Sequence, residues 1–150
     1  MTVITASNVI QYSSDAEDSD AGNDYVPLKS ITMTDSYTGS WRISFQLRND
    51  NNTTLTYGKI YRNGVAYGTE HTTTSDTYTE YSEDFSSINI TAGDTMELWG
   101  KNPPGADIIF VQDFRIKFDL LASNLVLVFK HQIGYGDSAI RLSNTRIKVD

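Results

Sequence analysis

Six aromatic residues with polar neighbours are the side chains of this sequence best suited to contact a ligand. They are Tyr57, Tyr61, Tyr67, Tyr78, Tyr81 and Trp99. An exposed aromatic ring stacks well on the apolar face of a pyranose, while Asn, Asp and Arg side chains bond to the hydroxyls. Tyr57 and Tyr61 share one face of a strand, and Trp99 lies opposite the apolar residues of its own strand. Tyr57, Tyr61 and Trp99 are therefore the candidates for a glycan-stacking surface; the alternative, which we favour from the sequence, is that the tyrosines cover their cross-strand neighbours.

Five carboxylates offer the chemistry of glycoside cleavage, which needs two carboxyl groups held a defined gap apart across a cleft. They are Glu80, Glu83, Asp84, Asp94 and Glu97. Strands with charged outer faces produce such pairs routinely, and the sequence does not set the gap between them. We therefore predict that the protein is not an enzyme and assign no catalytic residue.

An acidic segment near the N-terminus offers hard oxygen ligands of the kind that calcium takes. Its carboxylates are Asp15, Glu17, Asp18, Asp20 and Asp24. Their order departs from the D-x-[DN]-x-[DN]-G loop, so we interpret the segment as a mobile, solvated linker and leave calcium binding at 15–24 open. His71 and His131 are far apart and have no nearby ligand partners, and the chain has no Cys. We predict no metal site and no cofactor.

Composition limits the class of protein. A chain of 150 residues suits one domain, and the formal net charge of -7 argues against binding to nucleic acid, which depends on clustered Lys and Arg. The first ten residues have no basic n-region or long apolar core, so no signal peptide is visible. No run approaches the length of a membrane span, so we expect no membrane partner. Thr, Ser, Asn and Tyr are abundant, which favours strands and turns.

The clearest structural signal runs from Trp41 to Gly68. Every second residue from Trp41 to Leu47 is apolar, so one face of this strand should be buried and the other wet. The next strand ends at Asn63-Gly64, the pair best able to hold positive φ at both centres of a type I′ turn. This pattern predicts a β-hairpin.

Further strands are expected along the rest of the chain, at 2–12, 26–34, 72–81, 95–101, 108–121 and 140–149. In the longest of them, one face should carry Ile108, Phe110, Phe114, Ile116, Phe118 and Leu120. About nine or ten short strands separated by turns predict an all-β, antiparallel two-sheet β-sandwich, jelly-roll-like, with N- and C-terminal arms or extra strands.

We divide the chain into three parts. Residues 1–24 are expected to be an N-terminal strand or arm with an acidic linker, and residues 25–121 the β-sandwich domain. Residues 122–150 are expected to be a C-terminal hairpin or arm that completes the sandwich or contacts a neighbour. The apolar run from Leu125 to Phe129 cannot stay exposed without aggregating, so it should lie in the core or in an interface.

The stretch from about Leu28 to Phe118 resembles a small jelly-roll β-sandwich domain of bacteriophage and archaeal-virus structural proteins, which also recurs in some extracellular adhesive proteins. The segments that carry the resemblance are Trp41 to Leu47, Tyr57 to Val65, the Thr-rich strand through Glu83-Asp84, Ala92 to Leu98, and Val111 to Ile116. The resemblance implies a component of a virion and brings no catalytic residues. Residues 1–24 and 120–150 lie outside it and are candidates for assembly contacts.

Two functions follow from these observations. The first is a non-enzymatic virion structural protein, capsid-decorating, capsid or tail-associated, that self-assembles or docks on a viral shell. Its partners would be copies of itself in a homo-oligomer and other virion proteins, and its location the extracellular particle. The alternative is a carbohydrate-binding β-sandwich module with a glycan as its partner.

Overall fold

The computed structural model describes residues 1–105 and 107–121, and over these residues it contains nine strands and no helix. The strands are β1 (Thr2–Ser14), β2 (Asp18–Asp20), β3 (Val26–Thr32), β4 (Tyr37–Asn49), β5 (Thr56–Arg62), β6 (Val65–Thr73), β7 (Thr79–Ile90), β8 (Thr95–Lys101) and β9 (Ile109–Leu120). In this part of the chain, accordingly, no helix is long and apolar enough to cross a membrane.

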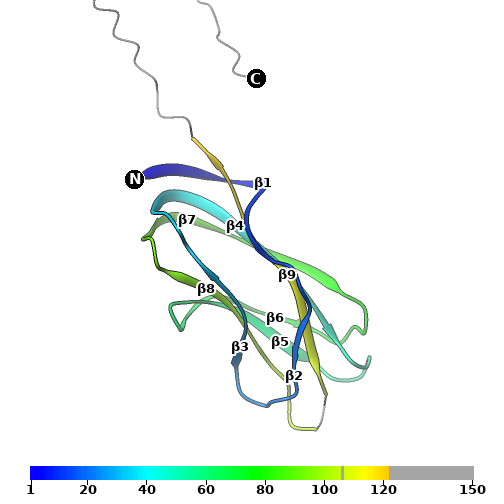
Figure 1. Cartoon of the computed structure of the whole chain (residues 1–150). Coiled ribbons are helices and arrows are strands. Elements are labelled where there is room, and N and C mark those ends of the chain that lie inside the picture. The colour runs from blue at the N-terminus through cyan, green and yellow to red at the C-terminus, as the bar shows by residue number, and fades with distance from the viewer. Residues whose placement is uncertain (106, 122–150) are drawn as a thin grey trace, which may run out of the picture.

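The strands form two sheets that pack face to face (Figure 1). Sheet A has five strands in the order β2-β9-β1-β4-β7, with an additional pairing between β9 and β4. Sheet B has four strands in the order β3-β8-β5-β6. The predicted all-β, two-sheet sandwich is confirmed.

One pairing departs from the predicted antiparallel arrangement. β1 runs parallel to β4 over a short stretch, from Thr2 opposite Tyr37 to Ile4 opposite Gly39. The backbones approach so closely that a Cβ at Gly39 would lie 2.0 Å from the carbonyl oxygen of Ile4. Gly39 also has φ of +133°, which L side chains rarely adopt, so this contact requires glycine.

The N-terminal segment, for which we expected a strand or an arm, contributes the strands β1 and β2 to sheet A. β1 pairs with β9 from Ile4 opposite Leu120 to Ser14 opposite Phe114, and β2 pairs with the same strand further along. The side chain of Ile4 is 2% exposed. Without β1 and β2, backbone N–H and C=O groups along one edge of β9 would lose their partners, which explains why the segment joins the sheet. The predicted arm at 122–150 lies outside the described residues.

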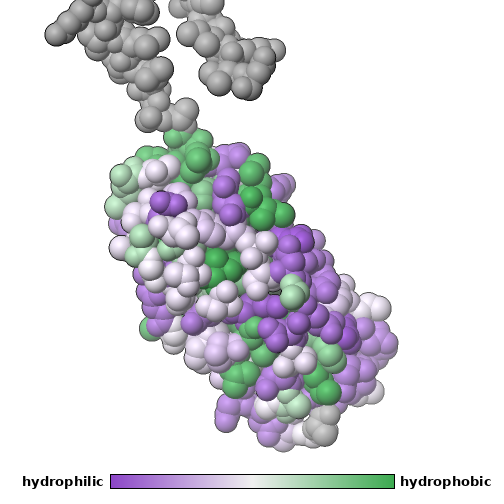
Figure 2. Space-filling view, in the orientation of Figure 1, coloured by the Kyte–Doolittle hydropathy of each residue, from purple (hydrophilic) through white to green (hydrophobic). Residues whose placement is uncertain are grey.

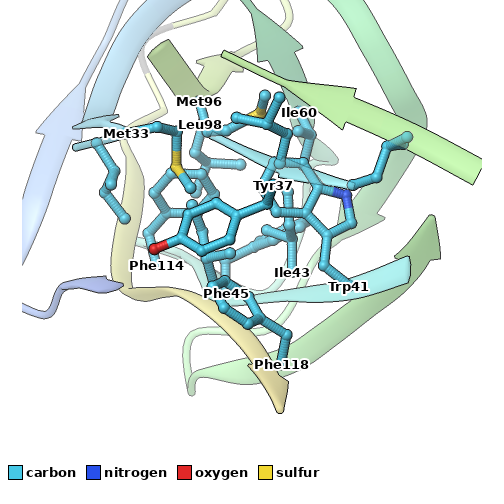
Figure 3. Packing of buried hydrophobic residues seen from close by; sticks show 14 of the residues in the cluster. Met33, Tyr37, Trp41, Ile43, Phe45, Ile60, Met96, Leu98, Phe114 and Phe118 are labelled. Atoms are coloured by element: carbon cyan, nitrogen blue, oxygen red, sulfur yellow. The ribbon is translucent and has the colours of Figure 1, made fainter. Parts of the chain in front are cut away.

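The hydrophobic core fills the space between the sheets (Figure 3). The alternation predicted from Trp41 to Leu47 is confirmed, because its four apolar side chains are all fully buried. Figure 3 shows Trp41, Ile43 and Phe45 of β4 in one cluster with Ile60 of β5 and Leu98 of β8. Burial of each such side chain stabilises the fold by about 1.5–3 kcal/mol.

The predicted buried face of β9 is confirmed only in the second half of the strand. Phe114, Ile116 and Phe118 are buried as predicted, but Ile109 and Val111 are buried in place of Ile108 and Phe110, and Leu120 is exposed. The cause is a bulge at Asp113, where φ is +53° and the register between β9 and β4 shifts. One extra residue reverses which face each later side chain occupies.

The predicted hairpin is present as β5 and β6. Its turn residues Asn63 and Gly64 have φ of 51° and 74°, as a type I′ turn requires. The predicted strand at 72–81 is instead divided, because β6 ends at Thr73 and β7 begins at Thr79 in the other sheet.

Candidate ligand-binding face

The three candidate glycan-stacking residues lie together on the outer face of sheet B. β5 and β8 pair with Tyr57 opposite Lys101, Lys59 opposite Trp99 and Tyr61 opposite Glu97. The alternate residues of both strands, such as Ile60 and Leu98, are fully buried and point into the core. Strand alternation therefore directs Tyr57, Tyr61 and Trp99 outward.

A continuous row of four rings covers this face. The rings of Tyr61 and Trp99 are stacked, with centroids 4.2 Å apart and planes 10° from parallel. Tyr25 packs against Tyr61 with centroids 6.0 Å apart. The ammonium nitrogen of Lys101 lies 4.6 Å from the ring centroid of Tyr25 and 4.7 Å from that of Tyr57, so it joins these two rings by cation–π contacts. We call Trp99, Tyr61, Tyr25 and Tyr57 the aromatic row.

Two carboxylates hold the row in place. Glu70 accepts a hydrogen bond of 2.6 Å from the Tyr25 hydroxyl and lies 3.7 Å from the Lys101 ammonium. Burial, reinforced by this hydrogen bond, raises the pKa of the Tyr25 phenol. Glu97 accepts a hydrogen bond of 3.0 Å from the indole N–H of Trp99. Each carboxylate thus orients one aromatic side chain on the surface.

Tyr25 reaches the row from the segment between β2 and β3, which is anchored by a buried side chain. The Asn102 backbone N–H donates to the carbonyl of Gly22 at 2.9 Å, and its side-chain amide donates to the carbonyl of Asp20 at 2.8 Å. Asn102 is 1% exposed. These bonds fix the path of the chain toward β3 and place Tyr25 across the face toward Glu70 of β6.

Sequence reasoning missed Tyr25, Glu70 and Lys101 as members of this face. The position of Lys101 was predictable from the sequence, because it follows Trp99 by two residues on an alternating strand and must share its face. The positions of Glu70 and Tyr25 were not predictable from local pattern, because they depend on strand pairing and on the path of a loop.

The other three aromatic candidates lie elsewhere. Tyr67 stacks on Phe85 with centroids 4.7 Å apart, and Tyr81 packs against the buried ring of Phe45 at 5.8 Å. Both therefore cover the open edge of the core, which is the alternative that the sequence left for the tyrosines. Tyr78 lies on the outer side of sheet A, where its hydroxyl donates to Glu17.

The acidic segment, which we predicted to be a mobile, solvated linker, contains β2 and keeps its paired carboxylates about half exposed. Three of its five carboxylates pair with basic side chains of the strands: Asp15 with Arg115 (2.8 Å), Glu17 with Arg48 (3.2 Å) and Asp18 with Lys29 (3.5 Å). Hydrogen bonding to Arg115 lowers the pKa of Asp15. The carboxylates point to different partners, and no group of three or more metal-ligating side chains occurs in the residues that the structure describes.

The carboxylates considered for hydrolysis also have separate partners. The contacts are Glu80 with Lys117 (3.8 Å), Glu83 with His71 (3.0 Å), Asp84 with Arg42 (2.7 Å), Asp94 with Arg62 (2.6 Å) and Glu97 with Trp99 (3.0 Å). They are divided among the outer face of sheet A, the edge between the sheets, a turn and the outer face of sheet B. His71 bridges the sheets through Glu83, and His131 lies outside the described residues.

No family model matches the chain, and no curated protein matches it. Solved structures with a similar fold include the C-terminal domain of EclA, a sugar-binding protein, with a TM-score of 0.53 at 9% identity over 71% of this chain and 80% of that one. Another is the CBM36-1 domain of a multidomain xylanase from the hindgut metagenome of Trinervitermes trinervoides, with a TM-score of 0.45 at 15% identity over 79% and 90%. A third is the CBM22-1 xylan-binding domain from Paenibacillus barcinonensis, with a TM-score of 0.38 at 13% identity over 75% and 88%.

At such low identity the likeness concerns the fold alone. Over residues 1–105 and 107–121 the chain is all-β with two packed sheets, and the general β-sandwich implied by the viral resemblance is supported. These structures lend no support to a viral origin.

Proposed function

We propose that the chain is a non-catalytic carbohydrate-binding β-sandwich module that binds its glycan on the outer face of sheet B. The observation that carries this proposal is the aromatic row, in which stacked Tyr61 and Trp99 are continued by Tyr25 and Tyr57. Aromatic rings with polar groups beside them provide both the apolar contact and the hydrogen bonds that a sugar needs.

The polar groups of the face leave capacity for a ligand. Glu70 and Glu97 engage their aromatic neighbours through Oε2 in the contacts above. Among the described residues, Oε1 of each carboxylate has no hydrogen-bond partner, so both are free to accept bonds from sugar hydroxyls. The rings are half-buried and already oriented, which lowers the entropy lost when a ligand binds.

The shared fold is consistent with this function. The EclA domain is described as part of a sugar-binding protein, and it has the same sandwich architecture. Because folds host many functions, the aromatic row and not the fold is the main support for the proposal.

The test is electrophoresis in gels that contain soluble xylan, mixed-linkage β-glucan or galactomannan. We expect at least one polysaccharide to retard the protein, and Trp99→Ala to abolish the retardation. Tyr78→Ala is the matched control, because it removes an aromatic ring from the outer side of sheet A, away from the row. Circular dichroism and thermal melting establish that both variants are folded. Unchanged retardation of Trp99→Ala, or no retardation by any of these polysaccharides or by a glycan array, contradicts the proposal.

A second candidate is the self-assembling virion structural protein, located in the extracellular particle. It is favoured by exposed apolar side chains where β1 begins and β9 ends, namely Val3, Leu120 and Leu121. The two strands meet there, since the Leu121 N–H donates to the Val3 carbonyl. Figure 2 shows hydrophobic residues gathered at this end, whereas much of the rest of the visible face is hydrophilic.

Size-exclusion chromatography with light scattering and electron microscopy test this candidate. We expect the protein to form oligomers or regular particles. The double variant Leu120→Asp, Leu121→Asp should prevent this assembly. A monomer at high concentration, with no particle in the micrographs, contradicts it.

A further inference from the structure

We infer that the ligand of the aromatic row is a neutral, extended glycan chain that lies along β5, and not a single sugar. This inference rests on the proposed function and adds the class of ligand. It follows from the length of the row and from the charges beside it.

The row is longer than one pyranose ring. Tyr57 and Tyr61 are four residues apart on β5, which corresponds to a rise of about 13 Å along a strand. The register between β5 and β8 is unbroken over this stretch, so no bulge shortens it. Tyr25 fills the space between the two ends, because it contacts Tyr61 directly and shares the ammonium of Lys101 with Tyr57. Only a ligand of several sugar units contacts both ends of the row.

The direction of the ligand follows from the same geometry. Tyr57 and Tyr61 lie on one strand, and Trp99 adds its ring to the Tyr61 end by stacking. The apolar surface is therefore elongated along β5 and not across the sheet. Glu70 lies beside Tyr25 in the middle of the row and Glu97 beside Trp99 at its end, so hydrogen-bond acceptors are spaced along the path of the chain.

The charges of the face favour a neutral glycan. Lys59 and Lys101 are balanced by Glu70 and Glu97, so the face has no excess of positive charge with which to attract an anionic polymer. The whole chain has a formal net charge of -7, which repels polyanions at low ionic strength. Uronate-rich and sulfated glycans are therefore disfavoured.

The experiment is isothermal titration calorimetry of the full chain with xylo-, cello- and manno-oligosaccharides of one to six units. For the series that binds, we expect the hexasaccharide to bind at least about tenfold more tightly than the disaccharide, a difference of about 1.4 kcal/mol. Tyr57→Ala should remove this gain with length, because it takes away the ring at one end of the row. Tyr78→Ala should behave as the unaltered protein does.

The outcomes separate the two proposals. Binding of a monosaccharide as tight as that of the hexasaccharide, or an unchanged length dependence in Tyr57→Ala, overturns the extended ligand while the glycan-binding function stands. Polygalacturonate, an anionic polysaccharide, is added to the gel assay described above. If it retards the protein more strongly than the neutral polysaccharides do, the preference for neutral chains is overturned. Failure of every glycan to bind overturns both proposals.

Discussion

Tyr61 and Trp99 are diagonal neighbours on adjacent strands, and their rings stack with centroids 4.2 Å apart and planes 10° from parallel. The diagonal relation arises because Trp99 lies directly opposite Lys59, two residues before Tyr61. Such a contact fixes both side chains before any ligand arrives. The pair therefore forms a pre-organised end to the aromatic row.

Tryptophan fluorescence should report ligand binding through Trp99 alone. Trp41 is fully buried in the core, whereas Trp99 lies on the outer face of sheet B. A polysaccharide that retards the protein in a gel should change its emission spectrum, and Trp99→Phe should remove the change. If the spectrum of Trp99→Phe responds as fully as that of the unaltered protein, the ligand does not lie on the aromatic row.

Residues Val3 and Ile4 provide a matched test of whether β1 is part of the sandwich. Ile4 is 2% exposed and Val3 is 46% exposed. Because truncation of a buried Ile leaves a cavity, Ile4→Ala should lower the free energy of unfolding by about 2–4 kcal/mol. Val3→Ala should cost less than about 1 kcal/mol. Urea denaturation measures both, and equal small losses would indicate a dispensable N-terminal arm.

Two glycines with positive φ should differ in their tolerance of alanine. A Cβ at Gly39 would collide with the Ile4 carbonyl oxygen at 2.0 Å, whereas a Cβ at Gly64 would meet nothing within 4 Å. Gly64→Ala carries only the strain of a left-handed backbone, about 1 kcal/mol. In Gly39→Ala the new Cβ also forces β1 away from β4. We therefore expect this variant to lose more than about 2 kcal/mol of its free energy of unfolding. Thermal melting of the two variants tests this order, and a smaller loss for Gly39→Ala would show that the parallel contact is looser than described.

Asp94 should make the stability of the fold depend on pH in the acid range. Hydrogen bonds from Asn63 and from the backbone N–H of Thr91, with Arg62 as the counter-ion, lower the pKa of Asp94 from 3.8 to about 2. Because the pKa is lower in the folded state, the ionised carboxylate stabilises the fold above pH 3.8, and this contribution is lost as the pH falls toward 2. Asp94→Asn should therefore cost about 1–2 kcal/mol at pH 7.

Urea denaturation of the protein and of Asp94→Asn at pH 7, 4 and 2.5 checks this expectation. The difference between the two should shrink as the pH falls below 4. Asp76→Asn is a suitable control, because Asp76 is exposed. If the difference in the free energy of unfolding between the unaltered protein and Asp94→Asn stays constant down to pH 2.5, Asp94 has no ionic role in stability.

Much of the candidate face was predictable from local pattern. Alternation in β5 and β8 placed Tyr57, Tyr61 and Trp99 on outward faces, and Asn63-Gly64 located the turn of the hairpin. These predictions depend on residues close together in the chain, so a single sequence contains the information. Their meeting as one row was not predictable, because it requires that β5 pair with β8 in the observed register.

Local pattern was enough to predict the alternating strands, the turn at Asn63-Gly64 and the apolar face through Trp41. Three features became visible only in the folded chain: β1 joins sheet A, the bulge at Asp113 reverses the buried face of β9, and Tyr25 crosses to Glu70. The two groups differ in the sequence separation of the residues that set them. Alternation and turn conformation are set by neighbouring residues, whereas strand order, bulges and the path of a loop are set by hydrogen bonds and packing between segments far apart in the chain.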